Sequence, residues 1–197
     1  LLDFEKFGNF HQQHGQNMRL NLRIDPAEWW VKQKFSDGGT RVREDSLYGS
    51  VQWNFLKSYF RKIIEPTSKV LDIGCGTGVY TNLMAQLGGD ATGVDPNPEY
   101  LGIARKSCVD GATFVLAEIG SKGGLDSIAD SSMDLIFISD ALLFYFVPMI
   151  PESAPNIDIL LSDIFRVLKP EGKFICMEPH STFYLSPWLG DEKRPFT

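Results

Sequence analysis

The sequence predicts an α/β fold: a doubly wound, mostly parallel sheet with helices on both faces and an N-terminal, mostly helical lid. Three observations support this prediction. Short apolar segments alternate five times with helical patterns between residues 50 and 177. These segments show no alternation of polar and apolar residues, which indicates strands that are covered on both faces. One of them ends in a glycine-rich loop that is followed directly by a helical pattern.

The first part of this pattern is a helix, a strand and a second helix. We predict a helix over residues 50–64, because apolar side chains recur there at helical spacing, and Pro66 ends it. A strand over 70–73 leads into the glycine-rich loop. The helix after the loop begins near Val79 and stops at the glycine pair 88–89, since glycine commonly terminates helices.

Two shorter strands follow, with a helix between them. The strand over 91–94 ends at Asp95. The segment Pro96-Asn97-Pro98 then opens a helix, because proline is favoured in the first helical turn. The strand over 113–116 is followed by a glycine-bearing connection that reaches residue 129.

The last part of the pattern is a buried strand, a helix and a final strand. The strand covers 133–138, and Asn156 caps a helix that has one apolar face and reaches Leu168. We expect a turn over 169–172, where Pro and Gly interrupt the helix, and a strand over 173–177.

The composition narrows the class of protein. The chain has 197 residues, of which 43% are hydrophobic and 22% charged, so it is long enough for one substantial core. No apolar run approaches the roughly 20 residues of a membrane span, and we expect no membrane partner. The net charge of −6 disfavours binding to nucleic acid. Three cysteines without metal-type spacing suit the reducing cytoplasm. Oligomeric state has no signal in the sequence.

We divide the chain into an N-terminal lid over 1–49, a binding domain over 50–180 and a C-terminal tail over 181–197. The lid contains Asp25-Pro26, which resembles a helix start. Because the chain begins with Leu1, we expect it to be a piece of a longer protein. We predict no metal site: His11 and His14 have no third partner, and we interpret them as a solvated polar segment.

The topology alone places a ligand site. In parallel sheets ligands bind beyond the carboxyl ends of the strands, where the strand order reverses. The residues expected at these ends are Gly74 to Gly78, Asp95, Ala117, Glu118, Ser139, Asp140 and Glu178 to His180.

The glycine spacing indicates which ligand binds. Dinucleotide loops have Gly-x-Gly-x-x-Gly, whereas here Gly74, Gly76 and Gly78 alternate and Val79 follows. Three glycines at this density suit a ligand without a pyrophosphate, whose amino-acid end lies along the loop. A carboxylate at Asp95 can accept hydrogen bonds from both hydroxyls of a ribose. A nicotinamide-dependent oxidoreductase is the alternative that this spacing disfavours.

These residues together resemble the class I S-adenosylmethionine-dependent methyltransferases, a superfamily with a Rossmann-like fold. The segment from Val70 to Gly78 is similar to their first motif, and Val94-Asp95 to their second. Leu116-Ala117-Glu118-Ile119 occupies the third, Asp134 to Ile138 the fourth, and Leu168 to Lys173 resembles the turn before the fifth strand. The resemblance covers about residues 50 to 180.

The resemblance implies S-adenosylmethionine as cofactor and S-adenosylhomocysteine as product. It implies that Asp95 holds the ribose, that Glu118 and Ile119 flank the adenine, and that the loop holds the methionine part. At position 118 the family more often has Asp. The cofactor-binding residues assigned in this way are Asp72, Gly74, Cys75, Gly76, Thr77, Gly78, Asp95, Pro96, Glu118, Ile119 and Ser139. The family usually adds two further strands. We expect the chain to be cut before them, and a reduced sheet is the alternative.

The implied reaction is the transfer of a methyl group to O, N or C of a small-molecule or carrier-bound acceptor by direct displacement. The protein then mainly aligns the nucleophile, and a base is needed only when the nucleophile arrives protonated. His180 is the candidate base, with a surface histidine as the alternative. Tyr145 lines the substrate pocket or packs beside its aromatic neighbours, and Asp140 contacts a ligand or caps a turn. A non-catalytic module that binds S-adenosylmethionine is the alternative function.

Overall fold

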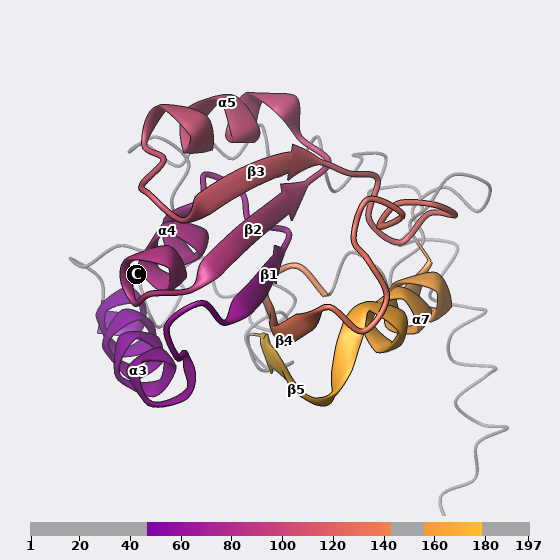
Figure 1. Cartoon of the computed structure of the whole chain (residues 1–197). Coiled ribbons are helices and arrows are strands. Elements are labelled where there is room, and N and C mark those ends of the chain that lie inside the picture. Colours follow the sequence, from indigo (N-terminus) through magenta and orange to yellow (C-terminus); the bar gives the residue numbers. More distant parts are fainter. Residues whose placement is uncertain (1–46, 143–155, 179–197) are drawn as a thin grey trace, which may run out of the picture.

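The computed structural model describes residues 47–142 and 156–178, which form a five-stranded sheet (Figure 1). All neighbouring strands are parallel, in the order β3-β2-β1-β4-β5. The strand order reverses between β1 and β4, which lie next to each other in the centre of the sheet. The strands are β1 (Lys69–Ile73), β2 (Asp90–Asp95), β3 (Ala112–Leu116), β4 (Met133–Ser139) and β5 (Leu168–Met177).

Helices cover both faces of this sheet, so the predicted α/β architecture is confirmed. The helices are α3 (Leu47–Ile63), α4 (Val79–Gln86), α5 (Pro98–Lys106) and α7 (Ile157–Val167). Side chains of α3, α4 and α5 share one hydrophobic core with alternate residues of the strands. Those of α7 share a second core with the residues between them, such as Leu71 and Ile136. Figure 1 shows α7 on the side of the sheet away from α3 and α4.

An aromatic cluster fixes α3 and α4 on the first face. The ring of Phe137 on β4 meets Phe60 of α3 at 5.1 Å and Tyr80 of α4 at 5.3 Å, both edge to face. Trp53 lies 5.9 Å from the Tyr80 ring. Edge-to-face geometry is one of the favoured arrangements of aromatic rings, so this cluster helps to set where α3 lies on the sheet.

Asparagine caps start two of the helices, and the sequence predicts the one at Asn156. The Asn97 side chain accepts hydrogen bonds from the backbone N–H groups of Glu99 and Tyr100, at the start of α5. Asn156 does the same for Asp158 and Ile159, at 2.7 and 3.2 Å. Each cap satisfies N–H groups that have no partner inside the helix.

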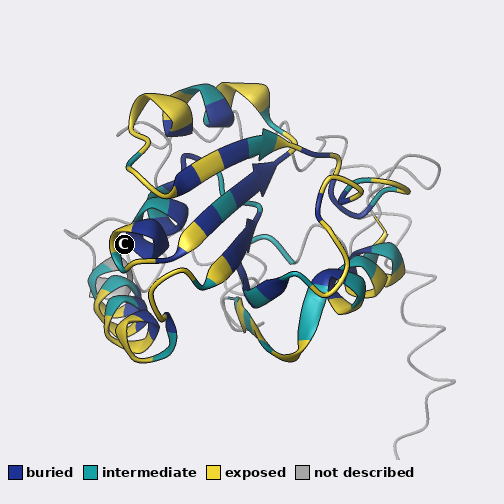
Figure 2. Cartoon of the chain, viewed as in Figure 1, coloured by how far each residue is buried: buried dark blue, intermediate teal, exposed yellow. Residues whose placement is uncertain are grey.

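Burial follows position in the sheet (Figure 2). Every residue of β1 after Lys69 is buried, and β4 is nearly as enclosed. The edge strand β5 has no buried residue, and Phe174 is 38% exposed. The continuous apolar runs of the central strands therefore reflect helices on both faces.

The turn predicted over 169–172 differs from the structure, because strand β5 already begins at Leu168. Leu168 pairs with Met133, but the next paired positions are Lys173 and Leu135, so the intervening residues of β5 bulge out of the ladder. The bulge places the Lys169 ammonium 2.6 Å from the Asp134 carboxylate, which also accepts a hydrogen bond from the Lys69 N–H. Pairing across this bulge makes the Pro-Gly segment part of a strand.

The lid over 1–49, apart from the first turn of α3, and the tail over 181–197 lie outside the described residues. Within the described part of the chain, no helix is both long enough and apolar enough to cross a bilayer.

Candidate active site

The loop between β1 and α4 is held by its backbone. The N–H groups of Gly74 and Cys75 both donate to the Val94 carbonyl, at 2.9 and 3.0 Å, and that of Gly78 donates to the Cys75 carbonyl. Gly74, Gly76 and Gly78 have φ values of 71°, 53° and 82°. This left-handed region favours glycine, which explains the alternating glycines.

Two glycines allow close packing around this loop. A Cβ at Gly78 would lie 2.6 Å from the Phe114 ring. A Cβ at Gly93, inside strand β2, would lie 2.7 Å from the Thr81 hydroxyl and 2.9 Å from the Cys75 sulfur. The loop therefore lies directly against β2 and β3. Gly93 was not among the predicted site residues, although a glycine inside a strand indicates such an approach.

Gly76, in the middle of the loop, is not closely packed. Apart from the chain neighbours of Gly76, no described residue has an atom within 4 Å of a Cβ placed there, although φ is +53°. Within the described part of the chain, the middle of the loop thus faces open space, while both ends pack against protein. This is the geometry in which a ligand can lie directly on a peptide backbone.

Asp95 connects this loop to the turn after β2. One carboxylate oxygen accepts a hydrogen bond from the Gly76 N–H and the other from the Asn97 N–H, both at 2.8 Å. The residue is 6% exposed, and burial raises the pKa of Asp95 while these two N–H groups act in the opposite direction. Because each carboxylate oxygen has two lone pairs, both oxygens can still accept one further hydrogen bond.

Asp72 lies behind the loop, inside the protein. Its carboxylate accepts a hydrogen bond of 2.6 Å from the Thr81 hydroxyl, which ties β1 to α4. Burial is the main cause that raises the pKa of Asp72 to about 7, the charge of Asp95 raises it further, and the Thr81 hydrogen bond opposes both. Burial also raises the pKa of the Cys75 thiol above its ordinary value. The sulfur is consequently a packing group at neutral pH.

The predicted residues after β2 and β3 have different environments. Pro96 and Glu118 are exposed, and Glu118 accepts hydrogen bonds from Ser121 through its backbone carbonyl. Ile119 is only 4% exposed and packs in the second core. Thr77, in the glycine loop, is buried.

The end of β4 brings Ser139 and Asp140 to the same edge of the sheet. Gln52 of α3 reaches them: its amide donates to the Ser139 hydroxyl at 3.1 Å and lies 3.5 Å from the Asp140 carboxylate. Glu178, just beyond β5, accepts hydrogen bonds from the N–H groups of Ala141 and Leu142. The sequence places Glu178 at this edge without a role, and it gives no signal for Gln52. His180 and Tyr145, the other catalytic candidates, lie outside the described residues.

The site residues fit S-adenosylmethionine. The loop offers an open backbone at Gly76, and the carboxylate of Asp95 lies beside it with acceptor capacity for a diol. Among the described residues, no three His, Cys, Asp or Glu side chains gather to form a possible metal site. The fold and this corner together define an α/β domain that binds a nucleoside-containing cofactor.

A family model described as "Methyltransferase domain" matches residues 71–176, and the chain belongs to this family. The predicted class, the S-adenosylmethionine-dependent methyltransferases, is thus confirmed, and with it the cofactor.

Part of the chain is similar to curated methyltransferases. The chain is 34% identical over 127 residues to the "Ubiquinone/menaquinone biosynthesis C-methyltransferase UbiE" of Rubrivivax gelatinosus, covering 64% of this chain and 43% of the relative. It is 37% identical over 105 residues to the mitochondrial "Ubiquinone biosynthesis O-methyltransferase" of Schizosaccharomyces pombe, covering 50% and 36%. The chain thus spans less than half the length of these two relatives.

Solved structures share the fold. The PH0226 protein of Pyrococcus horikoshii superposes with a TM-score of 0.58 at 24% identity, covering 74% of this chain and 61% of that one. An S-adenosylmethionine-dependent methyltransferase of Mesorhizobium loti gives 0.51 at 22% identity, covering 64% and 54%.

Proposed function

We propose that the protein transfers a methyl group from S-adenosylmethionine to a carbon or oxygen atom of a small aromatic acceptor related to quinone precursors. The observation that carries this proposal is the Gly74–Gly78 loop, open at Gly76, with the Asp95 carboxylate beside it. The quinone precursor comes from the names of the relatives, which include both a C-methyltransferase and an O-methyltransferase.

The cofactor supplies an electrophilic methyl carbon on a sulfonium. The protein's own task is then to bind and orient, which can contribute a large part of a rate enhancement. We assign Asp95 to the ribose hydroxyls, with Pro96 beside it, and the backbone of residues 74–78 to the amino-acid end. Asp72 supports the loop from behind through Thr81, as their hydrogen bond of 2.6 Å indicates.

The remaining assignments concern the adenine and the acceptor. Glu118 and Ile119 are proposed beside the adenine, Glu118 through its exposed side chain and Ile119 through its backbone, since the Ile119 side chain is in the core. Ser139 and Asp140 form the wall of the site next to β1. A phenolic or quinol acceptor arrives protonated, so methyl transfer to it requires a base, for which His180 is proposed, with Tyr145 lining the acceptor pocket.

The partner is therefore a small or carrier-bound molecule. The net charge of −6 supports the absence of a nucleic-acid substrate. The three cysteines are free thiols, which supports a reducing compartment such as the cytosol.

The test is methyl transfer from methyl-labelled S-adenosylmethionine in the presence of the full 197-residue chain. The acceptors are a naphthoquinol with one unsubstituted ring carbon and a catechol, which separate C- from O-methylation. We expect label in one of the two products, and loss of that label in the Asp95→Ala variant. Cofactor binding without label in any product of a metabolite panel would contradict the proposal and favour a non-catalytic binding module.

A further inference from the structure

The turn from Ser139 to Leu142 has an unusual backbone. Asp140 has φ of 55°, in the left-handed region that non-glycine residues adopt uncommonly. Its N–H donates to the Met177 carbonyl at 2.9 Å, so the turn is tied to the end of β5. A conformation of this kind persists when the surrounding structure fixes it.

Gln52 fixes the turn from the side of helix α3. Its side chain is nearly covered, with the residue 6% exposed, and its amide contacts Ser139 at 3.1 Å and Asp140 at 3.5 Å. Burial of an amide is unfavourable unless it is hydrogen-bonded. The Gln52 amide is therefore committed to the turn, although 87 residues separate it from Ser139.

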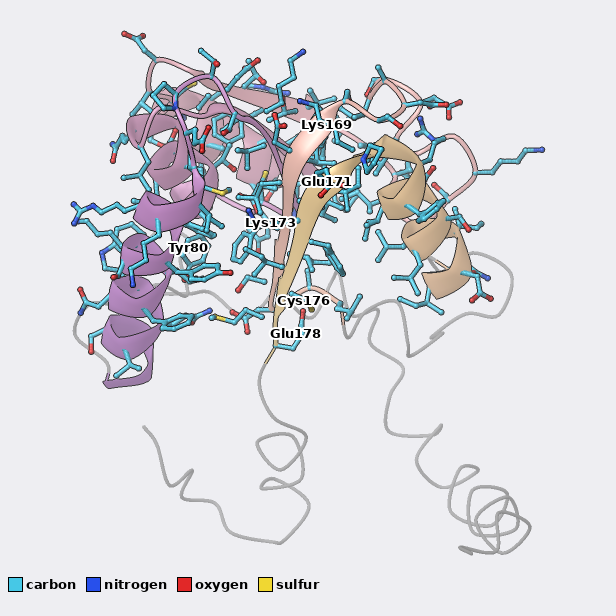
Figure 3. The ribbon with its side chains drawn as sticks, turned by 60° about the horizontal axis from the view of Figure 1, so that its bottom comes forward. Tyr80, Lys169, Glu171, Lys173, Cys176 and Glu178 are labelled. Atoms are coloured by element: carbon cyan, nitrogen blue, oxygen red, sulfur yellow. The ribbon has the colours of Figure 1, made fainter. Side chains whose placement is uncertain are left out.

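Glu178 fixes the turn from the other side. One oxygen of its carboxylate accepts hydrogen bonds from two successive N–H groups, those of Ala141 at 3.0 Å and Leu142 at 2.7 Å. Figure 3 shows Glu178 just past the end of β5, beyond Cys176. Hydrogen bonds to a charged acceptor are about twice as strong as neutral ones, and Glu178 accepts two of them from the turn.

The turn in its fixed position lies against the cofactor loop. A Cβ on Gly74 would be 2.8 Å from the Cβ of Ala141, so the first glycine of the loop and the turn are in close contact. A displacement of the turn would consequently change the space beside Gly74.

We propose that Gln52 and Glu178 are positioning residues that clamp the turn from Ser139 to Leu142 against Gly74 and thereby shape the cofactor site in advance of binding. This inference rests on the proposed function, because it requires that the loop binds S-adenosylmethionine. Neither residue needs to touch the cofactor. Preorganisation raises affinity by removing the ordering that binding would otherwise require.

The test measures binding of S-adenosylhomocysteine to the full chain by calorimetry. Glu178→Ala removes the acceptor of two backbone N–H groups and should weaken binding by about 10-fold. Glu178→Gln retains an acceptor oxygen and should stay within about 3-fold of the original protein. Gln52→Leu should weaken binding by about 3- to 10-fold, and Gln52→Asn, which is one methylene shorter, by a similar factor.

Gln86→Leu is the matched control, because Gln86 is exposed at the end of α4. The affinity of this variant for S-adenosylhomocysteine should equal that of the original protein. Amide hydrogen exchange at Ala141 and Leu142 gives a second readout, and it should accelerate in Glu178→Ala but not in Glu178→Gln. Should Glu178→Ala fail to fold, Gln52→Asn and Glu178→Gln keep the test decisive.

Unchanged affinity in Gln52→Leu and Gln52→Asn would overturn the clamp. Equal losses in Glu178→Gln and Glu178→Ala would also overturn it, because the retained acceptor would then have no effect. A failure of the original protein to bind S-adenosylhomocysteine would be a different result, and it would refute the proposed function instead.

Discussion

The two walls of the proposed cofactor site are built in different ways. The glycine loop is held by partners from the same β-α-β unit: Thr81 lies nine residues from Asp72, and Asp95 lies 19 residues from Gly76. The turn after β4 is held by Gln52, 87 residues away from Ser139, and by Glu178, 37 residues away from Ala141. The first wall is thus a local structure, whereas the second depends on how α3 and β5 pack on the sheet.

Because of this difference, we expect the two walls to respond differently to substitutions. A substitution inside the β-α-β unit should alter the loop directly, through backbone strain or a buried charge. A substitution near the second wall should act through the placement of whole elements.

The largest effect is expected for Gly78→Ala. The new Cβ would meet the Phe114 ring at 2.6 Å, and φ is +82°. Overpacking and backbone strain should together lower the free energy of unfolding by about 4 kcal/mol. Gly102→Ala is the matched control: Gly102 lies in α5, and outside that helix no described residue has an atom within 4 Å of the new Cβ, so the variant should be neutral or slightly stabilising. Urea unfolding measures both, and equal effects would show that the loop is not closely packed.

The next effect is a pH dependence that originates at Asp72, whose pKa is raised from 3.8 to about 7 by burial. Below about pH 3 the carboxyl is protonated in the folded and unfolded states, so stability is highest there with respect to this group. As the pH rises toward 7, the unfolded chain releases the proton first, and the free energy of unfolding falls.

Asp72→Asn should remove this loss. Between pH 5 and 8 the free energy of unfolding of the original protein, measured with urea, should fall by about 3 kcal/mol relative to that of the variant. If the free energies of unfolding of the two proteins change with pH in parallel, the buried Asp72 carboxyl titrates normally. That result would contradict the role assigned to Asp72 behind the loop.

A smaller effect, on binding, is expected for Asp95→Ala. Loss of hydrogen bonds to a carboxylate should weaken S-adenosylmethionine binding by about 10- to 150-fold. Asp95→Asn retains part of the acceptor capacity, so its affinity should lie between those of the original protein and Asp95→Ala. Asp110→Ala, at an exposed aspartate in the turn before β3, serves as the control. If calorimetry gives equal affinities for Asp95→Ala and the control, Asp95 does not bind the cofactor.

The smallest effect is expected at the amino ends of β4 and β5, far from both walls. Lys169 and Asp134 form an ion pair of 2.6 Å, and the side chains are 39% and 38% exposed. The Lys169 hydrogen bond is the main cause that lowers the pKa of Asp134. Because exposed pairs contribute little, Lys169→Met should lower the free energy of unfolding by about 0.5 kcal/mol. Lys173→Met on the same strand is the control, and a difference above about 2 kcal/mol would contradict this assignment.

Sequence patterns were sufficient for the first wall because its signals are local. Alternating glycines predict left-handed backbone at Gly74, Gly76 and Gly78, and Asp95 follows at the end of the next strand. The second wall could not be predicted in the same way. Gln52 looks like one polar position in an amphipathic helix, and only the packing of α3 brings its amide to Ser139. The bulge in β5 was missed for a similar reason, because Leu168 belongs to the strand only through its pairing with Met133.

If the proposed function is correct, the loop and Asp95 form a site for S-adenosylmethionine. Calorimetric titration of the full chain with S-adenosylhomocysteine, with NAD as the matched competitor, tests this claim. We expect one site with a Kd on the order of micromolar, about −8 kcal/mol, that NAD at the same concentration does not displace. Absence of binding, or displacement by NAD, would contradict the claim.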